Sequence, residues 1–445
     1  MENQDFSFSG ADSAYLSKMK AALADMNIVD IAETFDKLEK EQIIRLFRIL
    51  PKDTASEVFA YIDSDKQQYI IEALTDTEIG EIVNKLFVDD AVDFIEEMPA
   101  GVVKRVLQNV QSEKRQLINQ ILQYPDDCAG SIMTTEYVEL PENTTVRESF
   151  DVIRNTGLNK ETIYNCYVIR HDRLLLGVVS AKDLMLSRPG EPVSSIMDTN
   201  PVYAYTTDDR EAVADQFQKY DLLAMPVVDK ERRLVGIITV DDVMEVIVKE
   251  STEDIEKMSA LAPSHEPYLK TSVITLTRNR IVWLLVLMLS ATFTAMVIES
   301  FEDALTVMPV LMAFIPMLMD TGGSAGSQSA VLIIRGMALN EIKMSSIFAV
   351  WWKEIRVAVL CGAALMLVNF GRVLLMNRDI MLALTTSLAL YATVIMAKTV
   401  GCLLPLGAKL LRMDPAVMAS PVITTIADVL SLIIYFQIAK MILGL

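Results

Sequence analysis

Residues 316–329 carry the sequence PMLMDTGGSAGSQS, which places one carboxylate and three glycines inside an apolar stretch that runs from residue 304 to residue 339. Backbone at membrane depth must satisfy its hydrogen bonds within protein or against a wet cavity. A glycine-rich break is tolerated only in such a place. We therefore expect a broken membrane helix that lines a pore or a binding site.

A second carboxylate, Asp428, follows Thr424 in the last apolar stretch of the chain. Placing a charge at the bilayer centre costs about 2.5 to 3.5 kcal/mol on insertion scales, so intramembrane carboxylates usually have a function. Oxygen-bearing side chains lie near both aspartates in the sequence. With Asp320 as the first carboxylate, the candidate pore residues are Asp428, Asp320, Ser324, Ser420 and Thr424.

Oxygen ligands of this kind suit a hard divalent cation. Mg²⁺ keeps much of its hydration shell, so one or two carboxylates with carbonyls and waters suffice to hold it. A structural alternative stays open, in which either aspartate pairs with a cation on another helix and only holds the bundle together. The candidate partners for such a pair are Lys398, Arg335 and Arg356.

Five apolar segments fill the C-terminal part of the chain, and each is long enough to span hydrocarbon, for which about 20 residues are needed. They are residues 281–298, 305–337, 347–376, 380–411 and 415–443, within a predicted membrane domain over 278–445. Lysines and arginines gather on the loops that share a side with Arg278 and Arg280. The positive-inside rule therefore predicts a multi-pass protein of the cell membrane with its N-terminal half in the cytoplasm and its C-terminus outside.

The 445 residues carry a formal charge of -19, of which residues 1–276 contribute -22 and the remainder +3. An acidic soluble part lacks the basic footprint of a nucleic-acid-binding protein, so we expect no nucleic acid partner. Residues 1–13 are polar and acidic and do not form a signal sequence. The four cysteines lack paired spacing, and we interpret them as reduced packing residues: Cys128, Cys166, Cys361 and Cys402.

Residues 14–124 read as short amphipathic helices, because apolar residues recur at helical spacing without an alternating strand pattern. Similar units return about every two dozen residues. This period predicts a stacked solenoid of helical hairpins.

A longer repeat covers residues 131–247, in two copies over 131–187 and 195–247. SIMT at 131–134 returns as SIMD at 195–198, and GVVSAKDL at 177–184 returns as GIITVDDV at 236–243. The repeat resembles a tandem pair of CBS domains, an α/β module that often binds adenine nucleotides such as ATP. The resemblance implies ribose contacts from Ser180, Asp183, Thr239 and Asp242. The same pairs also fit a helix capping box, which needs no nucleotide.

Residues 241–259 are acidic and have apolar residues at helical spacing, as expected of an amphipathic connecting helix. The connecting segment between the CBS pair and the membrane domain is assigned to residues 248–270. Carboxylates also gather on the helical N-domain. Like charges on facing surfaces favour separation, and a bridging divalent ion favours a compact arrangement. The predicted sensor ligands are Asp89, Asp90, Asp93, Asp241, Asp242, Glu245, Glu250, Glu253 and Asp254. Each alone could be only a solvated helix face.

The order of these parts resembles the MgtE family of magnesium channels and transporters over essentially the whole chain. The matching motifs are TVDDV at 239–243, TEDI at 252–255, DTGG at 320–323, QSAVLIIR at 328–335, DPA at 414–416 and TTIAD at 424–428. The resemblance implies an all-α N-domain, an α/β CBS pair, a connecting (plug) helix and a five-helix all-α membrane domain. It also implies a homodimer with a central pore, in which Asp428 recognises hydrated Mg²⁺ and cytosolic Mg²⁺ holds the pore shut. Ser324 and Ser420 stand where family members have asparagine.

Two alternatives remain. A CBS-regulated membrane sensor of metal or nucleotide would conduct nothing, and a transporter of the same family could move another divalent ion such as Co²⁺ or Mn²⁺. We expect no enzyme, because the chain has no P-loop and no Ser/His/Asp order. Without an ATPase motif, the electrochemical gradient would drive the ion.

Overall fold

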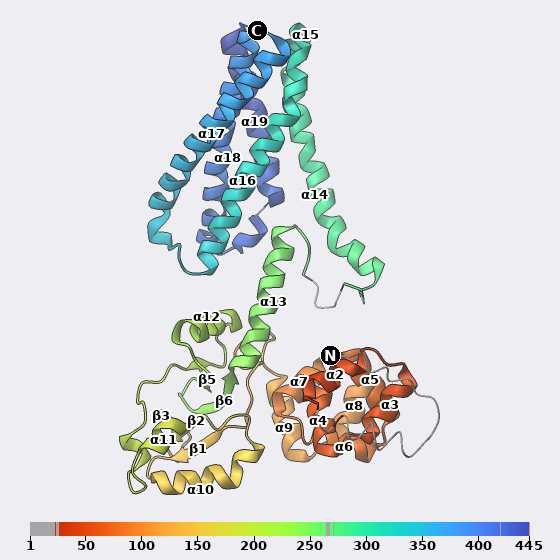
Figure 1. The fold of residues 1–445 in the computed structure, drawn as a ribbon, viewed down its shortest axis with the longest axis vertical. Helices are drawn as coiled ribbons and strands as arrows, with labels where there is room; N and C mark the ends of the chain where they lie inside the picture. Colours follow the sequence, from red (N-terminus) through yellow and green to blue (C-terminus); the bar gives the residue numbers. More distant parts are fainter. Residues whose placement is uncertain (1–22, 24–25, 264–267, 270, 419, 445) are drawn as a thin grey trace. The chain divides into compact units, whose positions relative to one another are not determined.

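The computed structural model describes residues 23, 26–263, 268–269, 271–418 and 420–444, and it divides into two compact units, Met1–Val248 and Lys249–Leu445. Because these units are separate bodies, each is described by itself. The first contains a helical domain followed by two small sheets, and the second contains long apolar helices (Figure 1).

The helical domain confirms the predicted run of short helices. An edge-to-face series of rings, Phe35–Phe47–Phe59–Phe94, runs through its core with centroid separations of 6.4, 6.1 and 5.1 Å. Such pairs add to the stability that burial of the rings supplies. The helices are α2 (Ile28–Phe35), α3 (Lys40–Ile49), α4 (Lys52–Ala60), α5 (Ser64–Ala73), α6 (Asp76–Val83), α7 (Val88–Glu96), α8 (Ala100–Asn109) and α9 (Ser112–Ile121).

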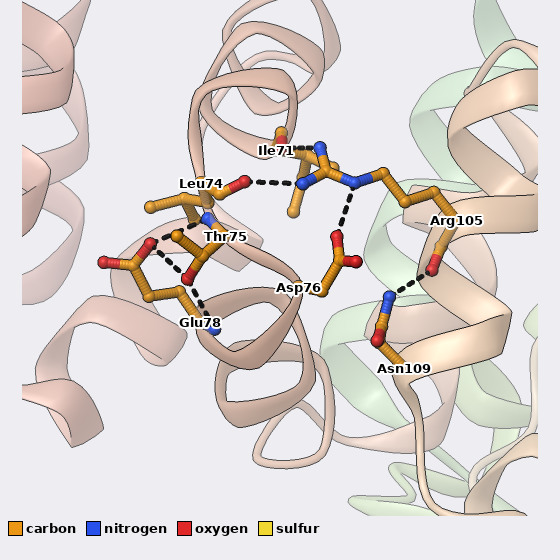
Figure 2. A network of polar contacts seen from close by, with 7 residues as sticks. All are labelled: Ile71, Leu74, Thr75, Asp76, Glu78, Arg105 and Asn109. Carbon is orange, nitrogen blue, oxygen red and sulfur yellow. Dashed lines mark hydrogen bonds and ion pairs between the residues drawn. The ribbon is translucent and has the colours of Figure 1, made fainter.

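Arg105 on α8 ties neighbouring repeats together (Figure 2). Its guanidinium donates to the Ile71 and Leu74 carbonyls at 3.0 and 2.7 Å, where α5 ends, and to Asp76 Oδ1 at 2.8 Å, where α6 begins. Carbonyls at a helix C-terminus lack intrahelical partners, so this one side chain satisfies two of them. Thr75 and Glu78 form a capping box at the start of α6.

Each CBS repeat builds a three-stranded sheet with one parallel and one antiparallel pair, in the order β1-β2-β3 and β4-β5-β6. The structure explains why both repeats have glycine at the equivalent position. A Cβ on Gly177 would lie 2.5 Å from the Asp198 carbonyl oxygen, and one on Gly236 would lie 2.8 Å from that of Thr134. The elements are β1 (Val138–Pro141), α10 (Val146–Thr156), β2 (Asn165–Ile169), β3 (Leu175–Ser180), α11 (Ala181–Leu186), β4 (Ala204–Tyr205), α12 (Arg210–Tyr220), β5 (Ala224–Val228) and β6 (Leu234–Thr239).

The connecting helix confirms the predicted amphipathic helix over 241–259 to within one residue at each end. It is α13 (Val240–Met258), which starts directly after the last strand of the second repeat and ends before Pro263. The helices that follow are α14 (Val273–Ser300), α15 (Glu302–Val307), α16 (Ile315–Ala338), α17 (Ile347–Asn377), α18 (Ile380–Leu410) and α19 (Ser420–Leu443). Within the second unit, α16 packs along α18 and α19 (Figure 1).

Four of the described segments are long and apolar enough to cross a membrane: Val273–Ser300, Met344–Asn377, Ile380–Leu410 and Pro415–Leu443. The helix α16 has 24 residues, about 36 Å at 1.5 Å per residue, which is also long enough. Its glycines, serines and aspartate lower its hydropathy. Two of its polar residues, Asp320 and Ser324, line a cavity between α16 and α19.

Three sequence expectations need correction. The glycine-rich stretch is not a break, since α16 is helical from Ile315 to Ala338. The irregular backbone lies earlier, at the 3₁₀ segment Pro309–Phe314, so the expected span 305–337 is divided there. The prolines explain this, because proline interrupts a helix interior but fits its first turn, where Pro316 sits.

Cys361 is exposed, unlike the three buried cysteines, and is not a packing residue.

Candidate functional site

A cavity of about 430 Å³ lies between α16 and α19 and brings together four of the five predicted pore residues. Asp320 and Ser324 come from α16, and Thr424 and Asp428 come from α19. The fifth, Ser420, begins α19, and its side chain lies outside the described residues. The cavity therefore holds two carboxylates and two hydroxyls, the oxygen donor set that a hydrated divalent cation prefers.

The polar residues of α16 form one stripe. Asp320, Ser324 and Gln328 are spaced four residues apart and are exposed in the single chain, so they share one face of the helix. The opposite face is buried against α18 and α19.

Glycines bring the backbone of α16 close to its neighbours. A Cβ on Gly322 would lie 2.6 Å from Ser431 Oγ, and one on Gly323 would lie 3.0 Å from Thr424 Cγ2. The glycines thus serve close helix packing beside the cavity, where the sequence had suggested a broken helix.

Gly323→Val is expected to lower cation flux about tenfold, because its side chain would press on Thr424 and move α16 away from α19 beside the cavity. Flux in liposomes at matched insertion measures the effect. Gly371→Val is the matched control, since a Cβ on Gly371 of α17 meets nothing within 4 Å. Equal flux in both variants would mean that Gly323 is not beside the conducting path.

The alternative of structural ion pairs finds no support at the two aspartates. Among the described residues, neither Asp320 nor Asp428 forms an ion pair within 4.0 Å, and the ammonium of Lys398 instead donates to Ser329 at 3.3 Å. Arg335 and Arg356 are exposed. Within the described ranges, no cationic side chain therefore forms an ion pair with either carboxylate of the cavity.

A second cavity, of about 260 Å³, lies within the first unit between the helical domain and the CBS pair. Four predicted sensor residues line it, and two carboxylates that the sequence analysis missed join them. The carboxylate lining consists of Asp89, Asp90, Asp241, Asp242, Glu57 and Glu161. The missed Glu161 follows a polar turn of the first CBS repeat, and only the three-dimensional structure brings that turn to the helical domain.

Burial and mutual repulsion hold protons on this cluster. Burial raises the pKa of Glu161 to about 8 and that of Asp242 to about 7, with further contributions from neighbouring carboxylates. Burial, followed by Asp93, raises the pKa of Asp90 to about 6, and the pKa of Asp89 is raised well above its usual value. Two buried oxygens, Asp89 Oδ1 and Glu161 Oε2, have no hydrogen-bond partner. Unpaired buried carboxylate oxygens are costly and suit a cation ligand.

A buried lysine and further acidic residues lie around this cluster. Lys114 on α9 donates to the Leu86 carbonyl, and burial lowers its pKa against the opposing effect of Glu136 and Asp89. Glu136 accepts from Thr134 Oγ1 at 2.8 Å and from the Val88 backbone N–H at 3.4 Å, so it joins the first CBS repeat to the start of α7. The predicted residues Asp93 and Glu245 act on the cluster through their charges.

The remaining sensor residues, Glu250, Glu253 and Asp254, belong to the second unit. There, Lys257 pairs with Glu253 at 2.5 Å and with Asp414 at 2.7 Å. Burial, followed by Asp414, raises the pKa of Asp254. The end of α13 is thereby tied to the segment that precedes α19. No three His, Cys, Asp or Glu side chains within the described ranges are close enough to hold a metal ion.

The candidate nucleotide residues are engaged as helix caps. Ser180 Oγ donates to Asp183 Oδ2 at 2.5 Å and accepts from the Asp183 backbone N–H at 3.0 Å. Thr239 Oγ1 donates to Asp242 Oδ2 at 2.6 Å, and Asp242 also lines the acidic cavity. The capping interpretation therefore describes the hydrogen bonds that these residues make.

Comparisons with known proteins cover nearly the whole chain. Residues 315–438 match MgtE, described as a divalent cation transporter, residues 26–127 match the MgtE intracellular N domain, and residues 129–189 and 193–249 match the CBS domain. The chain is 33% identical over 429 residues to the magnesium transporter MgtE of Thermus thermophilus, which covers 96% of this chain and 95% of the relative.

Two solved structures each cover about half of this chain. The soluble part of a magnesium transporter is 28% identical, with a TM-score of 0.51, and covers 54% of this chain and 94% of that one. The cytosolic domain of the Mg²⁺ channel MgtE in complex with ATP is 34% identical, with a TM-score of 0.49, over 51% of this chain and 93% of that one.

Proposed function

The chain belongs to the MgtE family of magnesium transporters, and from that premise we propose that it moves Mg²⁺ down its electrochemical gradient through the cavity lined by Asp320 and Asp428. The observation that carries this proposal is a pair of carboxylates in one cavity that form no ion pair with any cationic side chain the structure describes. Two carboxylates attract a divalent cation strongly, and the surrounding hydroxyls can hydrogen-bond to its water shell.

A pore built from two copies fits the same observations. The exposed stripe of Asp320, Ser324 and Gln328 would be costly against lipid, and α14 has no buried residue in the single chain. In a homodimer, two such stripes would face each other across a central pore. The charge pattern of the loops supports an orientation with the acidic N-terminal part in the cytoplasm and the C-terminus outside.

The liposome experiment separates transport from sensing. Purified full-length protein is reconstituted with an internal Mg²⁺ indicator, and external Mg²⁺ is added without ATP. We expect Mg²⁺ to enter, and to enter faster when the interior is negative. A sensor that does not transport would give the leak of empty liposomes. Parallel runs with Co²⁺, Mn²⁺ and Ca²⁺ establish the selectivity.

We further propose that cytosolic Mg²⁺ closes the pore by binding the acidic cluster. One or two carboxylates of this cavity would hold a hydrated Mg²⁺, with waters completing its shell. Asp89 and Glu161 would supply the unpartnered oxygens, and Asp90, Asp241 and Asp242 would contribute negative charge around the ion. Glu250, Glu253 and Asp254 would extend the sensor along α13, whose end is tied to Asp414 ahead of α19. Mg²⁺ bound here would stabilise the compact arrangement by removing repulsion between carboxylates.

A nucleotide at the CBS pair is a second proposal with narrower support. Ser180 with Asp183 and Thr239 with Asp242 stand at the ribose-contacting positions of the CBS motif. Asp183 is exposed, whereas Asp242 opens onto the acidic cavity, which repels phosphate. The first repeat is therefore the better place for an adenine nucleotide.

The raised pKa values predict a pH dependence in the absence of Mg²⁺. The unfolded chain releases these protons near pH 4, whereas the folded cluster keeps them up to about pH 6 at Asp90 and about pH 8 at Glu161. The folded state therefore binds more protons in this window, and its stability falls as the pH rises through it. Thermal unfolding of the full chain from pH 5 to pH 8 should show this fall.

Two controls sharpen that measurement. Glu161→Gln should flatten the slope above pH 6, and saturating Mg²⁺ should stabilise the protein most at pH 8, where it competes with the fewest protons. Stability that stays level or rises between pH 5 and pH 8 without Mg²⁺ would show that the cluster is not held protonated.

A further inference from the structure

A lysine lies buried among the helices of the second unit. Lys398 on α18 is 6% exposed, and its ammonium donates to Ser329 Oγ on α16 at 3.3 Å. The hydroxyl of Ser329, which is 0% exposed, donates in turn to Glu354 Oε2 on α17 at 2.7 Å. One chain of hydrogen bonds thus crosses three helices and ends in a carboxylate.

Ser329 suits the middle of this chain of hydrogen bonds. A hydroxyl donates one proton and accepts through its lone pairs, so Ser329 can serve both neighbours at once. An ammonium among membrane helices is costly without a compensating charge. Within the described part of the chain Lys398 forms no direct ion pair. Glu354 therefore compensates it through the polarised serine hydroxyl.

The bridge holds the back of the helix that lines the candidate pore. Ser329 follows Asp320 by nine residues, which at 3.6 residues per turn places the two on opposite faces of α16. Next to the bridge, α16 and α18 meet backbone to backbone, because a Cβ on Gly401 would collide with the Gly326 carbonyl. A polar bridge beside a close glycine contact fixes the position of α16 against α18.

We propose that Lys398 is a positioning residue for cation passage: its bridge to Glu354 fixes α16 and keeps the ammonium away from the Asp320–Asp428 cavity. This inference rests on the proposed function. Asp320 is the one acidic residue of α16, and Asp428 is the one acidic residue of α19. Ala397, the neighbour of Lys398, packs in one buried cluster with Ala427, the neighbour of Asp428. Without Glu354, the uncompensated ammonium is left to compete with Mg²⁺ for Asp428.

The test follows Mg²⁺ uptake into liposomes over a range of external Mg²⁺. Glu354→Gln should raise the half-saturating Mg²⁺ concentration at least fivefold, since an uncompensated ammonium then opposes cation binding. Lys398→Met should lower maximal uptake without raising the half-saturating Mg²⁺ concentration. In this variant α16 loses its hydrogen bond to α18, but no uncompensated ammonium remains to oppose Mg²⁺. The double variant should return half-saturation to within twofold of the wild type, and Lys398→Arg should keep the wild-type value.

Lys409→Met, which removes an exposed lysine from the same helix, is the matched control and should behave as the wild type. Provided that the wild type takes up Mg²⁺, two results would overturn the role of Lys398. One is an unchanged half-saturating Mg²⁺ concentration in Glu354→Gln, and the other is a double variant whose half-saturating concentration is as high as that of Glu354→Gln. Absence of uptake by the wild type would instead overturn the proposed function.

Discussion

Asp428→Asn is expected to reduce Mg²⁺ flux at least a hundredfold while the protein still inserts into the membrane. The substitution keeps the size of the side chain and removes its charge from a cavity whose described lining contains two carboxylates and no cationic side chain. Unit charges 4 Å apart attract by roughly 4 kcal/mol at an effective dielectric constant of 20, and a divalent ion doubles that attraction. Even after a water layer widens the separation, the loss exceeds the 2.7 kcal/mol or so that corresponds to a hundredfold change.

Growth rescue of a Mg²⁺-dependent strain and liposome flux measure this effect. Asp303→Asn removes an exposed aspartate of α15 and serves as the matched control with wild-type flux. Rescue by Asp428→Asn at the wild-type level would reject Asp428 as the pore carboxylate.

Neutralising Asp241, Glu250 and Glu253 together is expected to leave the pore open at Mg²⁺ concentrations that close the wild type. Each bound ion at about 100 times its dissociation constant stabilises the closed arrangement by roughly 2.7 kcal/mol. Two such ions supply about 5.4 kcal/mol, close to the roughly 5.5 kcal/mol that reverses a population from 1:99 to 99:1. Loss of these ions should therefore shift open probability nearly completely.

Open probability and protease protection of the cytosolic part, each with and without millimolar Mg²⁺, measure this switch. A matched variant with the exposed acids Glu41, Glu113 and Glu231 neutralised has the same change in net charge and should close normally. Equal closure in the two triple variants would show that the wrong residues were assigned, and a wild type that Mg²⁺ neither protects nor closes would end the sensor proposal.

The sequence predicted the elements whose signals are local. Helical spacing over the described residues of 14–124, the CBS repeat landmarks and four of the five long apolar stretches became the expected structure. The two membrane aspartates were found because a charge in an apolar segment stands out in a sequence, and they do share one cavity.

Signals that depend on distant contacts could not be read from the sequence. The glycines of α16 suggested a broken helix, whereas they fit the close approach of Ser431 and Thr424 over a hundred residues later. Glu161 reaches the acidic cavity because the first CBS repeat packs against the helical domain. Lys398 was one of three candidate partners of the aspartates in the structural alternative, and it hydrogen-bonds to Ser329.

The central claim is that Mg²⁺ itself crosses the membrane at the Asp320–Asp428 cavity, and the reversal potential tests it most directly. Currents are recorded from the purified protein in a bilayer with Mg²⁺ as the only permeant cation and a tenfold Mg²⁺ gradient. We expect the reversal potential to follow the Mg²⁺ gradient, by about 30 mV per tenfold for two charges, and Asp428→Asn to abolish the current. A reversal potential that ignores the Mg²⁺ gradient, or an undiminished current in Asp428→Asn, would contradict it.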